Sequence, residues 1–171
     1  MLIGRESDAD IDPVAAVTSA AFGPPDSPPP LETRLLEELR LTDAWLPQLS
    51  LVAVADDGRL AGHVVCTRGH VDASPALGLG PLSVAPDRQR GGVGTALIHA
   101  VLGAADALDE PAVVLLGDPA YYARFGFRPA AEYGITPPQP DWAPHFQVRT
   151  LHAWTPELRG RFAYAEPFER A

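Results

Sequence analysis

The sequence contains little cysteine and little positive charge, and it has no long apolar run. Its single cysteine, Cys66, excludes an internal disulfide and supplies no cysteine cluster for a metal ion, which suits a reducing cytoplasm. No basic-then-apolar leader follows Met1, and no apolar run approaches the roughly 18 residues of a membrane-spanning helix. We therefore expect a cytoplasmic protein with no membrane partner. The 13 basic residues against 22 acidic ones give a net charge of −9, which disfavours a nucleic-acid partner.

The remaining composition predicts one folded domain over residues 1–171. A chain of this length can bury roughly two-thirds of the surface that it exposes when unfolded. Hydrophobic residues make up 46% of it, which argues against disorder even though the chain contains 19 prolines. The prolines cluster outside the periodic segments, so we interpret them as stiffened loops. The sequence has no internal repeats.

Periodicity along the chain predicts helices alternating with strands. Helical spacing of apolar residues indicates a first helix that starts at Asp12, or earlier at Asp8, and ends at Phe22. Further helices are predicted over 31–39 and 93–109, and a short one after 118–119. Strands are predicted over 1–6, 51–55, 59–68, 77–84, 112–116, 146–151 and 160–165.

The segment 77–97 carries the strongest functional signal, because it reads as a strand, a glycine-rich turn and the start of a helix. Gly91, Gly92 and Gly94 permit a tight loop before the helical spacing begins. Backbone N–H groups at a helix N-terminus lack intrahelical partners and lie at the positive end of the helix dipole. The loop can therefore hold a phosphate or pyrophosphate without a lysine, and Arg88 and Arg90 add positive charge beside it.

The spacing of these glycines decides between phosphate-binding motifs. A P-loop requires a lysine that is missing here, and a dinucleotide fingerprint fails at Leu97, where a third glycine is needed. The pattern Q/R-x-x-G-x-G/A does fit Gln89-Arg90-Gly91-Gly92-Val93-Gly94, which follows Leu82-Ser83-Val84-Ala85-Pro86. This combination resembles the acetyl-CoA-binding segment of the GNAT superfamily of N-acetyltransferases.

The resemblance implies acetyl-CoA as cosubstrate and no metal. The backbone N–H groups of Leu82 and Val84 would hold the pantetheine arm and face the thioester carbonyl, whereas Pro81 has no N–H to offer. The residues implied in coenzyme binding are Leu82, Ser83, Val84, Gln89, Arg90, Gly91, Gly92, Val93, Gly94 and Thr95.

A second motif lies in the segment 117–127, and its Tyr122 is the candidate catalytic residue. Tyr122 to Phe127 matches the Y-x-x-x-G-F pattern of many GNAT enzymes, in which the tyrosine acts as general acid toward the coenzyme sulfur. The sequence pattern GDP-x-YY-x-RFGF in this segment resembles that of the YhbS-like branch of the superfamily. One position departs from the pattern: the superfamily often has an asparagine seven residues before the tyrosine, where this chain has Leu115.

The resemblance spans nearly the whole chain and implies the GNAT acyl-CoA N-acyltransferase fold. That fold is mixed α/β (α+β), with a central, mostly antiparallel sheet whose central strands splay apart and which helices flank. It places the acceptor contacts within residues 22–39. Residues 132–144, with Trp142, can border a pocket, but by default we expect this loop to cross the outside of the sheet.

The general base stays open at this point. No carboxylate lies on the predicted central strand, which leaves His63, Glu32, Glu37 or an ordered water chain. His63 is the odd polar residue on a mostly apolar strand face, where a histidine is more often structural than catalytic.

We expect an N-acetyltransferase that transfers the acetyl group from acetyl-CoA to a primary amine by direct attack. The partners would be acetyl-CoA and a small-molecule or peptide amine, and a homodimer is allowed for. The negative charge near Glu32, Glu37 and Glu38 favours a cationic or neutral amine over an acidic one. Two rival interpretations are a non-catalytic acyl-CoA-binding or sensing module and a structural protein without a ligand.

Overall fold

The fold contains both helices and strands, and a computed structural model describes it over residues 1–171. The helices are α1 (Ile11–Phe22), α2 (Leu31–Arg40), α3 (Val93–Ala107) and α4 (Pro119–Tyr122). The strands are β1 (Leu2–Arg5), β2 (Trp45–Val54), β3 (Leu60–Val71), β4 (Ser74–Val84), β5 (Ala112–Leu116), β6 (Arg128–Pro129), β7 (Ile135–Thr136), β8 (Phe146–Thr150) and β9 (Gly160–Ala163). No helix has both the length and the hydrophobicity needed to cross a membrane.

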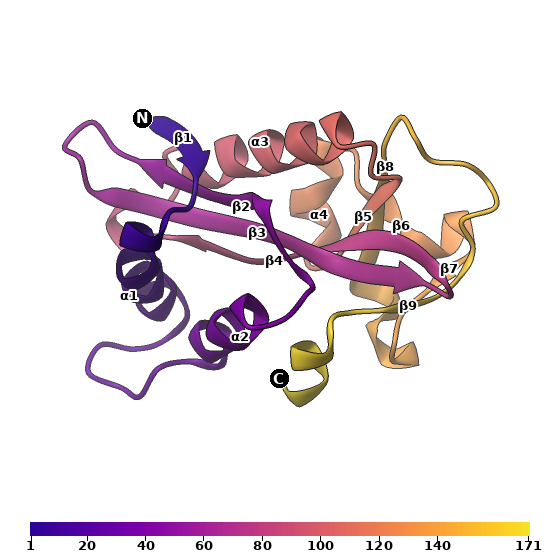
Figure 1. The fold of residues 1–171 in the computed structure, drawn as a ribbon, viewed down its shortest axis with the longest axis horizontal. Helices are drawn as coiled ribbons and strands as arrows, with labels where there is room; N and C mark the ends of the chain where they lie inside the picture. The colour runs from indigo at the N-terminus through magenta and orange to yellow at the C-terminus, as the bar shows by residue number, and fades with distance from the viewer.

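The strands form one sheet in the order β1-β2-β3-β4-β5-β8-β6, and β9 adds to the far end of β3 and pairs with β7. Along the main path every pair is antiparallel except β4 with β5. Helices α1 and α2 lie on one face of the sheet and α3 on the other (Figure 1). The predicted fold class, a mostly antiparallel sheet flanked by helices, is confirmed.

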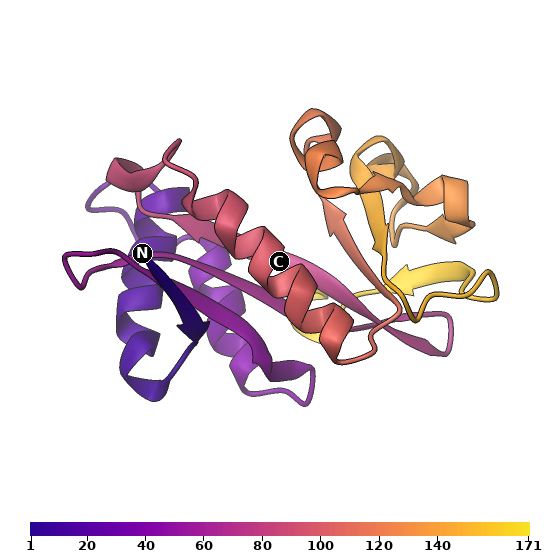
Figure 2. The same cartoon turned by 90° about the horizontal axis from the view of Figure 1, so that it is seen from above.

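Strands β4 and β5 pair over only two residues each before they separate. Their register contains two pairs, Leu77 with Val113 and Gly78 with Val114. Beyond these pairs β4 continues to Val84 alongside β3, whereas β5 pairs along its whole length with β8. The two strands diverge in Figure 2. The predicted splay of the central strands is thus present, and it leaves one edge of β4 without a neighbouring strand from Leu79 onward.

A bulge accounts for a proline inside the central strand. Val64 faces Leu82 and Cys66 faces Leu79, so the dipeptide Gly80-Pro81 occupies β4 opposite a single residue of β3. A bulge interrupts the ladder locally, which is where a residue without an N–H is tolerated. Gly80 has a φ of +136°, a value that only glycine adopts readily.

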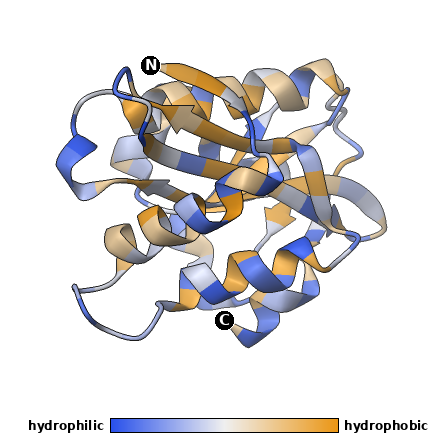
Figure 3. Cartoon of the chain, turned by 60° about the vertical axis from the view of Figure 1, so that its left-hand side comes forward, coloured by the Kyte–Doolittle hydropathy of each residue, from blue (hydrophilic) through white to orange (hydrophobic).

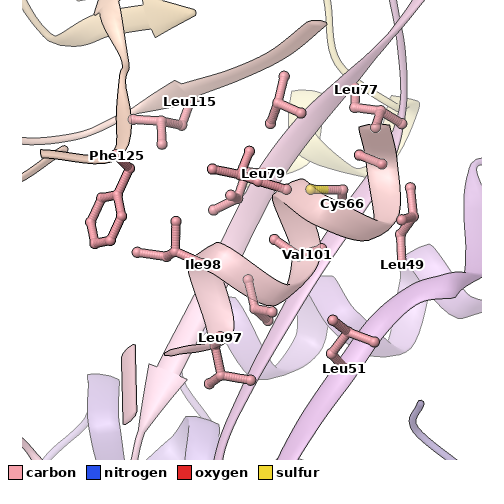
Figure 4. Packing of buried hydrophobic residues seen from close by; sticks show 14 of the residues in the cluster. Leu49, Leu51, Cys66, Leu77, Leu79, Leu97, Ile98, Val101, Leu115 and Phe125 are labelled. Atoms are coloured by element: carbon pink, nitrogen blue, oxygen red, sulfur yellow. The ribbon is translucent and has the colours of Figure 1, made fainter. Parts of the chain in front are cut away.

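Helix α3 covers the main hydrophobic core. Figure 4 shows Leu97, Ile98 and Val101 of α3 beside the strand residues that complete this core. A Cβ atom at Gly62 of β3 would lie 2.9 Å from Leu97 Cδ1, so glycine lets the helix approach the sheet closely. The core residues that the strands contribute include Leu49, Leu51, Ala53, Ala61, Val64, Cys66, Leu77, Leu79, Val113 and Leu115.

The opposite face of the sheet packs against α1 and α2. Val14 and Leu36 from these helices meet Val52 and Val65 from the strands. Hydrophobic and hydrophilic residues alternate along α2, as expected of a helix with one buried face (Figure 3).

Strict alternation along β3 predicts Leu60, Gly62, Val64 and Cys66 on one face of the sheet, and this prediction is wrong at the first two residues of the strand. From Gly62 to Thr67 the side chains alternate as expected, but Leu60 packs on the α1 side and Ala61 on the α3 side. A register shift between Ala53 and Val54 of β2 inserts one extra residue into β3 there, which exchanges the faces of the two side chains.

Several element boundaries also differ from the prediction. Helix α1 starts at Ile11, between the two predicted starts, and a 3-10 turn over Asp8–Asp10, where Ser7 closes a capping box with Asp10, leads directly into it. Strand β2 begins at Trp45 rather than at residue 51, since apolar alternation is weak over its first residues. The predicted loop 132–144 contains short 3-10 turns and β7.

Candidate active site

The glycine loop ends at the N-terminus of α3 with its amides uncapped. Gly92 is the N-cap residue with a φ of +88°, and no side chain caps this helix. Arg90 also has a positive φ, of +64°. Because the first-turn N–H groups have no side-chain partner, they are free to bind an anion.

A cavity of about 560 Å³ lies against this loop, and we call it the loop cavity. Its lining residues are Ala21, Phe22, Leu82, Val84, Gln89, Arg90, Gly92, Gly94, Thr95, Tyr121 and Arg124. Seven of the ten residues predicted to bind coenzyme are among them. The other three are placed differently: the Ser83 hydroxyl donates to Thr18 Oγ1 (3.1 Å), Val93 is buried in the core, and Gly91 lines a separate hollow beside Arg88.

Arginine supplies all the positive charge at the loop cavity, since the chain contains no lysine. Arg90 and Arg124 both line the cavity. Arg88 lies beside the loop as expected, in the hollow that Gly91 also lines, but its Nη2 pairs at 2.5 Å with Asp57 in the β2–β3 turn and it does not line the loop cavity. Arg124 was missed, although it lies inside the second motif; its Nε donates to the Tyr121 carbonyl (2.9 Å), and its guanidinium lies 4.7 Å from the Tyr121 ring centroid.

The open edge of β4 offers backbone donors toward the gap. Ala85 donates its N–H to the Ala61 carbonyl of β3 at 2.8 Å. In an antiparallel pair, alternate residues direct their N–H toward the partner strand, so Ser83 faces β3 while Leu82 and Val84 face away from it. The Val84 carbonyl also faces that way, because it accepts from Gln89 Nε2 (3.2 Å).

A second cavity, of about 440 Å³, lies where β4 and β5 separate, and we call it the gap cavity. It is lined by Phe22, Glu32, Leu35, Leu79, Gly80, Pro81, Leu82, Leu115, Leu116, Tyr122, Trp142, Tyr164, Phe168 and Ala171. Phe22 and Leu82 line both cavities, so the loop cavity and the gap cavity meet at these two residues.

Local signals place Tyr122 at the gap cavity. Asp118 caps α4 by accepting from the Ala120 N–H (2.9 Å), and Gly126 ends the following turn with a φ of +85°. A Cβ at Gly117 would lie 2.6 Å from Tyr122 Cε2, so this glycine makes room for the ring. Burial, with a smaller contribution from Tyr121, raises the pKa of the Tyr122 phenol, so it is protonated at neutral pH.

The adjacent tyrosines line different cavities. Tyr121 lines the loop cavity, and its hydroxyl would lie 3.4 Å from a Cβ at Gly94. Tyr122 lines the gap cavity and packs edge-on against Phe127, with 5.9 Å between ring centroids. A single turn of helix therefore presents one phenol to each cavity.

Of the side chains considered as general base, only Glu32 lines the gap cavity. Glu37 does not line it. His63 is fully buried on the α1 side of the sheet, where its Nε2 lies 2.9 Å from Ser50 Oγ, and that hydroxyl donates to Glu6 (2.9 Å). Burial, with a contribution from the Arg40 charge, lowers the pKa of His63 to about 3. His63 is therefore a structural histidine.

The default expectation for Trp142 is wrong. The loop that carries it folds back against the sheet, and Trp142 lines the gap cavity opposite residues of β4 and β5. Phe22, Glu32 and Leu35 do come from the segment predicted to contact the acceptor. No group of three or more His, Cys, Asp or Glu side chains is placed to hold a metal ion.

Comparisons with known proteins agree with this geometry. Residues 19–127, more than half of the chain, match the model of the Acetyltransferase (GNAT) family. The chain is 34% identical over 122 residues to the uncharacterized N-acetyltransferase YhbS of Escherichia coli strain K12, with 70% of this chain and 72% of YhbS covered.

Two solved structures are similar over almost the whole chain. One is the crystal structure of E. coli YhbS in complex with CoA, with a TM-score of 0.87, 30% identity, and 99% of this chain and 92% of that chain covered. The other is a GNAT family acetyltransferase from Brucella melitensis in complex with acetyl-CoA, with a TM-score of 0.79, 32% identity, and coverage of 98% and 97%.

The buried state of His63 predicts a specific loss of stability in acid. Because its pKa is about 3 in the folded chain and about 6.5 when unfolded, its contribution is complete above pH 6.5 and declines as the pH falls below that value. Between pH 7 and pH 5 this loss amounts to about 2 kcal/mol. Urea unfolding of wild type and His63→Gln at both pH values should give a smaller pH dependence for the variant.

His70 is the control, because it is exposed on the same strand and its replacement by glutamine should preserve the wild-type dependence. Equal pH dependence of wild type and His63→Gln would contradict a buried, neutral His63.

Proposed function

The chain belongs to the Acetyltransferase (GNAT) family, and we propose that it transfers the acetyl group of acetyl-CoA directly to a primary amine. Family membership makes it an acetyl-CoA-dependent acyltransferase. The observation that carries the proposal is the junction of two cavities at the open edge of β4. One cavity has an anion-binding loop, and the other has a protonated tyrosine and a carboxylate.

The loop cavity is the proposed coenzyme site. Its uncapped helix N-terminus and its two arginines suit the pyrophosphate, since arginine binds phosphate through paired hydrogen bonds. The coenzymes named for the two similar structures, CoA and acetyl-CoA, support this choice. The pantetheine arm would run along the open edge of β4, where the N–H groups of Leu82 and Val84 face away from β3. These donors can stabilise negative charge that develops on the thioester oxygen.

The gap cavity is the proposed acceptor site. The amine lone pair attacks the thioester carbonyl carbon, a C–N bond forms, and the C–S bond breaks. Tyr122 gives its phenolic proton to the departing sulfur. Glu32, directly or through water, receives a proton from the amine, and exchange with solvent restores both side chains. With Glu32 at the cavity, the chain does not lack a base, which favours an enzyme over a non-catalytic coenzyme-binding module.

The first prediction from this proposal concerns Gly92. Gly92→Glu should weaken acetyl-CoA binding by roughly 10- to 100-fold, because it adds bulk and negative charge where the pyrophosphate would lie. Calorimetric titration with acetyl-CoA measures the effect. Gly103→Glu is the matched control, because Gly103 is exposed on α3 with open space around it. Unchanged affinity in a folded Gly92→Glu variant would remove the loop from the coenzyme site.

The second prediction concerns Tyr122. A phenol has a pKa of about 10 against about 8.5 for a thiol, and burial raises it further here, so it can donate to the leaving thiolate at neutral pH. Tyr122→Phe keeps the ring packing and should lower the single-turnover rate by roughly 10²–10⁴-fold while acetyl-CoA affinity changes little.

Two further substitutions calibrate this result. Tyr133→Phe removes a hydroxyl outside both cavities and should have no effect on the rate. Tyr121→Phe should affect coenzyme affinity more than the chemical step, because Tyr121 lines the loop cavity. Equal single-turnover rates for Tyr122→Phe and wild type would mean that another group assists the departing sulfur.

A further inference from the structure

The lining of the gap cavity restricts what kind of amine it can take. Eleven of its fourteen lining residues are hydrophobic. Two of them, Phe22 and Leu116, keep 44% and 45% of their surface exposed. Exposed apolar surface that borders a cavity is typical of a surface that a ligand covers.

The charged side chains that line this cavity indicate where the polar group of a ligand binds. Glu32 is the only side chain of the lining that is ionised at neutral pH, and no arginine contributes to it. Burial raises the pKa of both phenols, Tyr122 and Tyr164, so they stay neutral. The cavity therefore has one acidic side chain, that of Glu32, among mostly hydrophobic residues.

The aromatic side of the cavity leads into further space. Trp142, Tyr164 and Phe168 line both the gap cavity and a neighbouring hollow of about 570 Å³. Tyr164 and Phe168 pack against each other with their ring planes tilted by 39° and their centroids 4.9 Å apart, so the border between the two cavities is aromatic. A ligand body larger than the gap cavity's 440 Å³ can extend past this border into the hollow, whose remaining lining includes the charged residues Asp72, Arg161 and Glu169.

We propose, on the basis of the function argued above, that the acceptor is a primary amine carried on an apolar, preferably aromatic, body. The ammonium group approaches Glu32, and the body lies against the wall formed by Phe22, Trp142 and Phe168. Polyamines and aminoglycosides fit poorly, because their additional amines and hydroxyls would lose water without gaining hydrogen-bond partners on that wall.

The test compares an amine that has an aromatic body with two amines that have polar bodies. With acetyl-CoA saturating, thiol release should give a kcat/KM roughly 10- to 100-fold higher for 2-phenylethylamine than for ethanolamine or spermidine, as expected for burial of one phenyl group. A dipeptide amide with an N-terminal phenylalanine tells whether the amine belongs to a small molecule or to a peptide. In either case an apolar preference supports the proposal.

Substitutions test whether Trp142 is responsible for the preference for an aromatic amine. Trp142→Ala should lower the ratio of kcat/KM for 2-phenylethylamine over ethanolamine by roughly tenfold, and Trp142→Phe should restore most of it. Leu41→Ala, at an exposed leucine outside both cavities, is the control and should leave the ratio unchanged.

The outcomes separate this proposal from the function on which it rests. Turnover of spermidine or ethanolamine as efficient as that of 2-phenylethylamine would overturn the proposed acceptor class but not acetyl transfer. A preference for long-chain acyl-CoA over acetyl-CoA with small amines would also overturn it, because the acyl chain would then occupy the apolar wall. If no amine releases thiol, the proposed catalysis is refuted. Calorimetric binding of 2-phenylethylamine to the CoA-loaded protein would in that case still support an aromatic amine as the ligand of the gap cavity. No binding and no turnover would overturn both.

Discussion

The separation of β4 from β5 is the constraint on which the rest of the site depends. A sheet normally continues its hydrogen bonding across every internal strand, but these two strands share only the pairs at Leu77 and Gly78. Strand β5 then follows β8, and the bulge at Gly80-Pro81 interrupts β4 at the same level. The N–H groups of Leu82 and Val84 are consequently left to bind something other than a strand. Both cavities meet beside them.

Helices place functional groups at both ends of the gap between β4 and β5. Helix α3 starts at one end with uncapped amides, whereas α2 contributes Glu32 at the other. The short helix α4 spans the junction, because its consecutive tyrosines line different cavities. The network of Arg40, Glu6, Ser50 and His63 lies on the α1 and α2 side of the sheet, outside both cavities, and supports the packing of α2 against the sheet. Its role is stability rather than catalysis.

Local signals in the sequence predicted the turns and caps around the loop cavity and α4, because glycines, prolines and caps act over a few residues. Gly92, Asp118 and Gly126 occupy the roles that their neighbours in sequence imply. Long-range contacts could not be predicted in this way. Trp142 reaches the gap cavity from a loop without periodicity, and Arg88 turns away because Asp57, on a distant turn, pairs with it. The bulge that exchanges Leu60 and Ala61 likewise depends on the partner strand.

Amide hydrogen exchange, followed residue by residue by NMR, tests the central claim most directly: the open edge of β4 holds the thioester arm of the coenzyme. Saturating acetyl-CoA should slow exchange at Leu82 and Val84, whose N–H groups face the gap, by about tenfold or more. Ser83 should change little, because its N–H faces β3 in the free protein as well. Slowed exchange confined to residues 92–95, with Leu82 and Val84 unaffected, would contradict the account, since the coenzyme would then bind the loop without entering the gap.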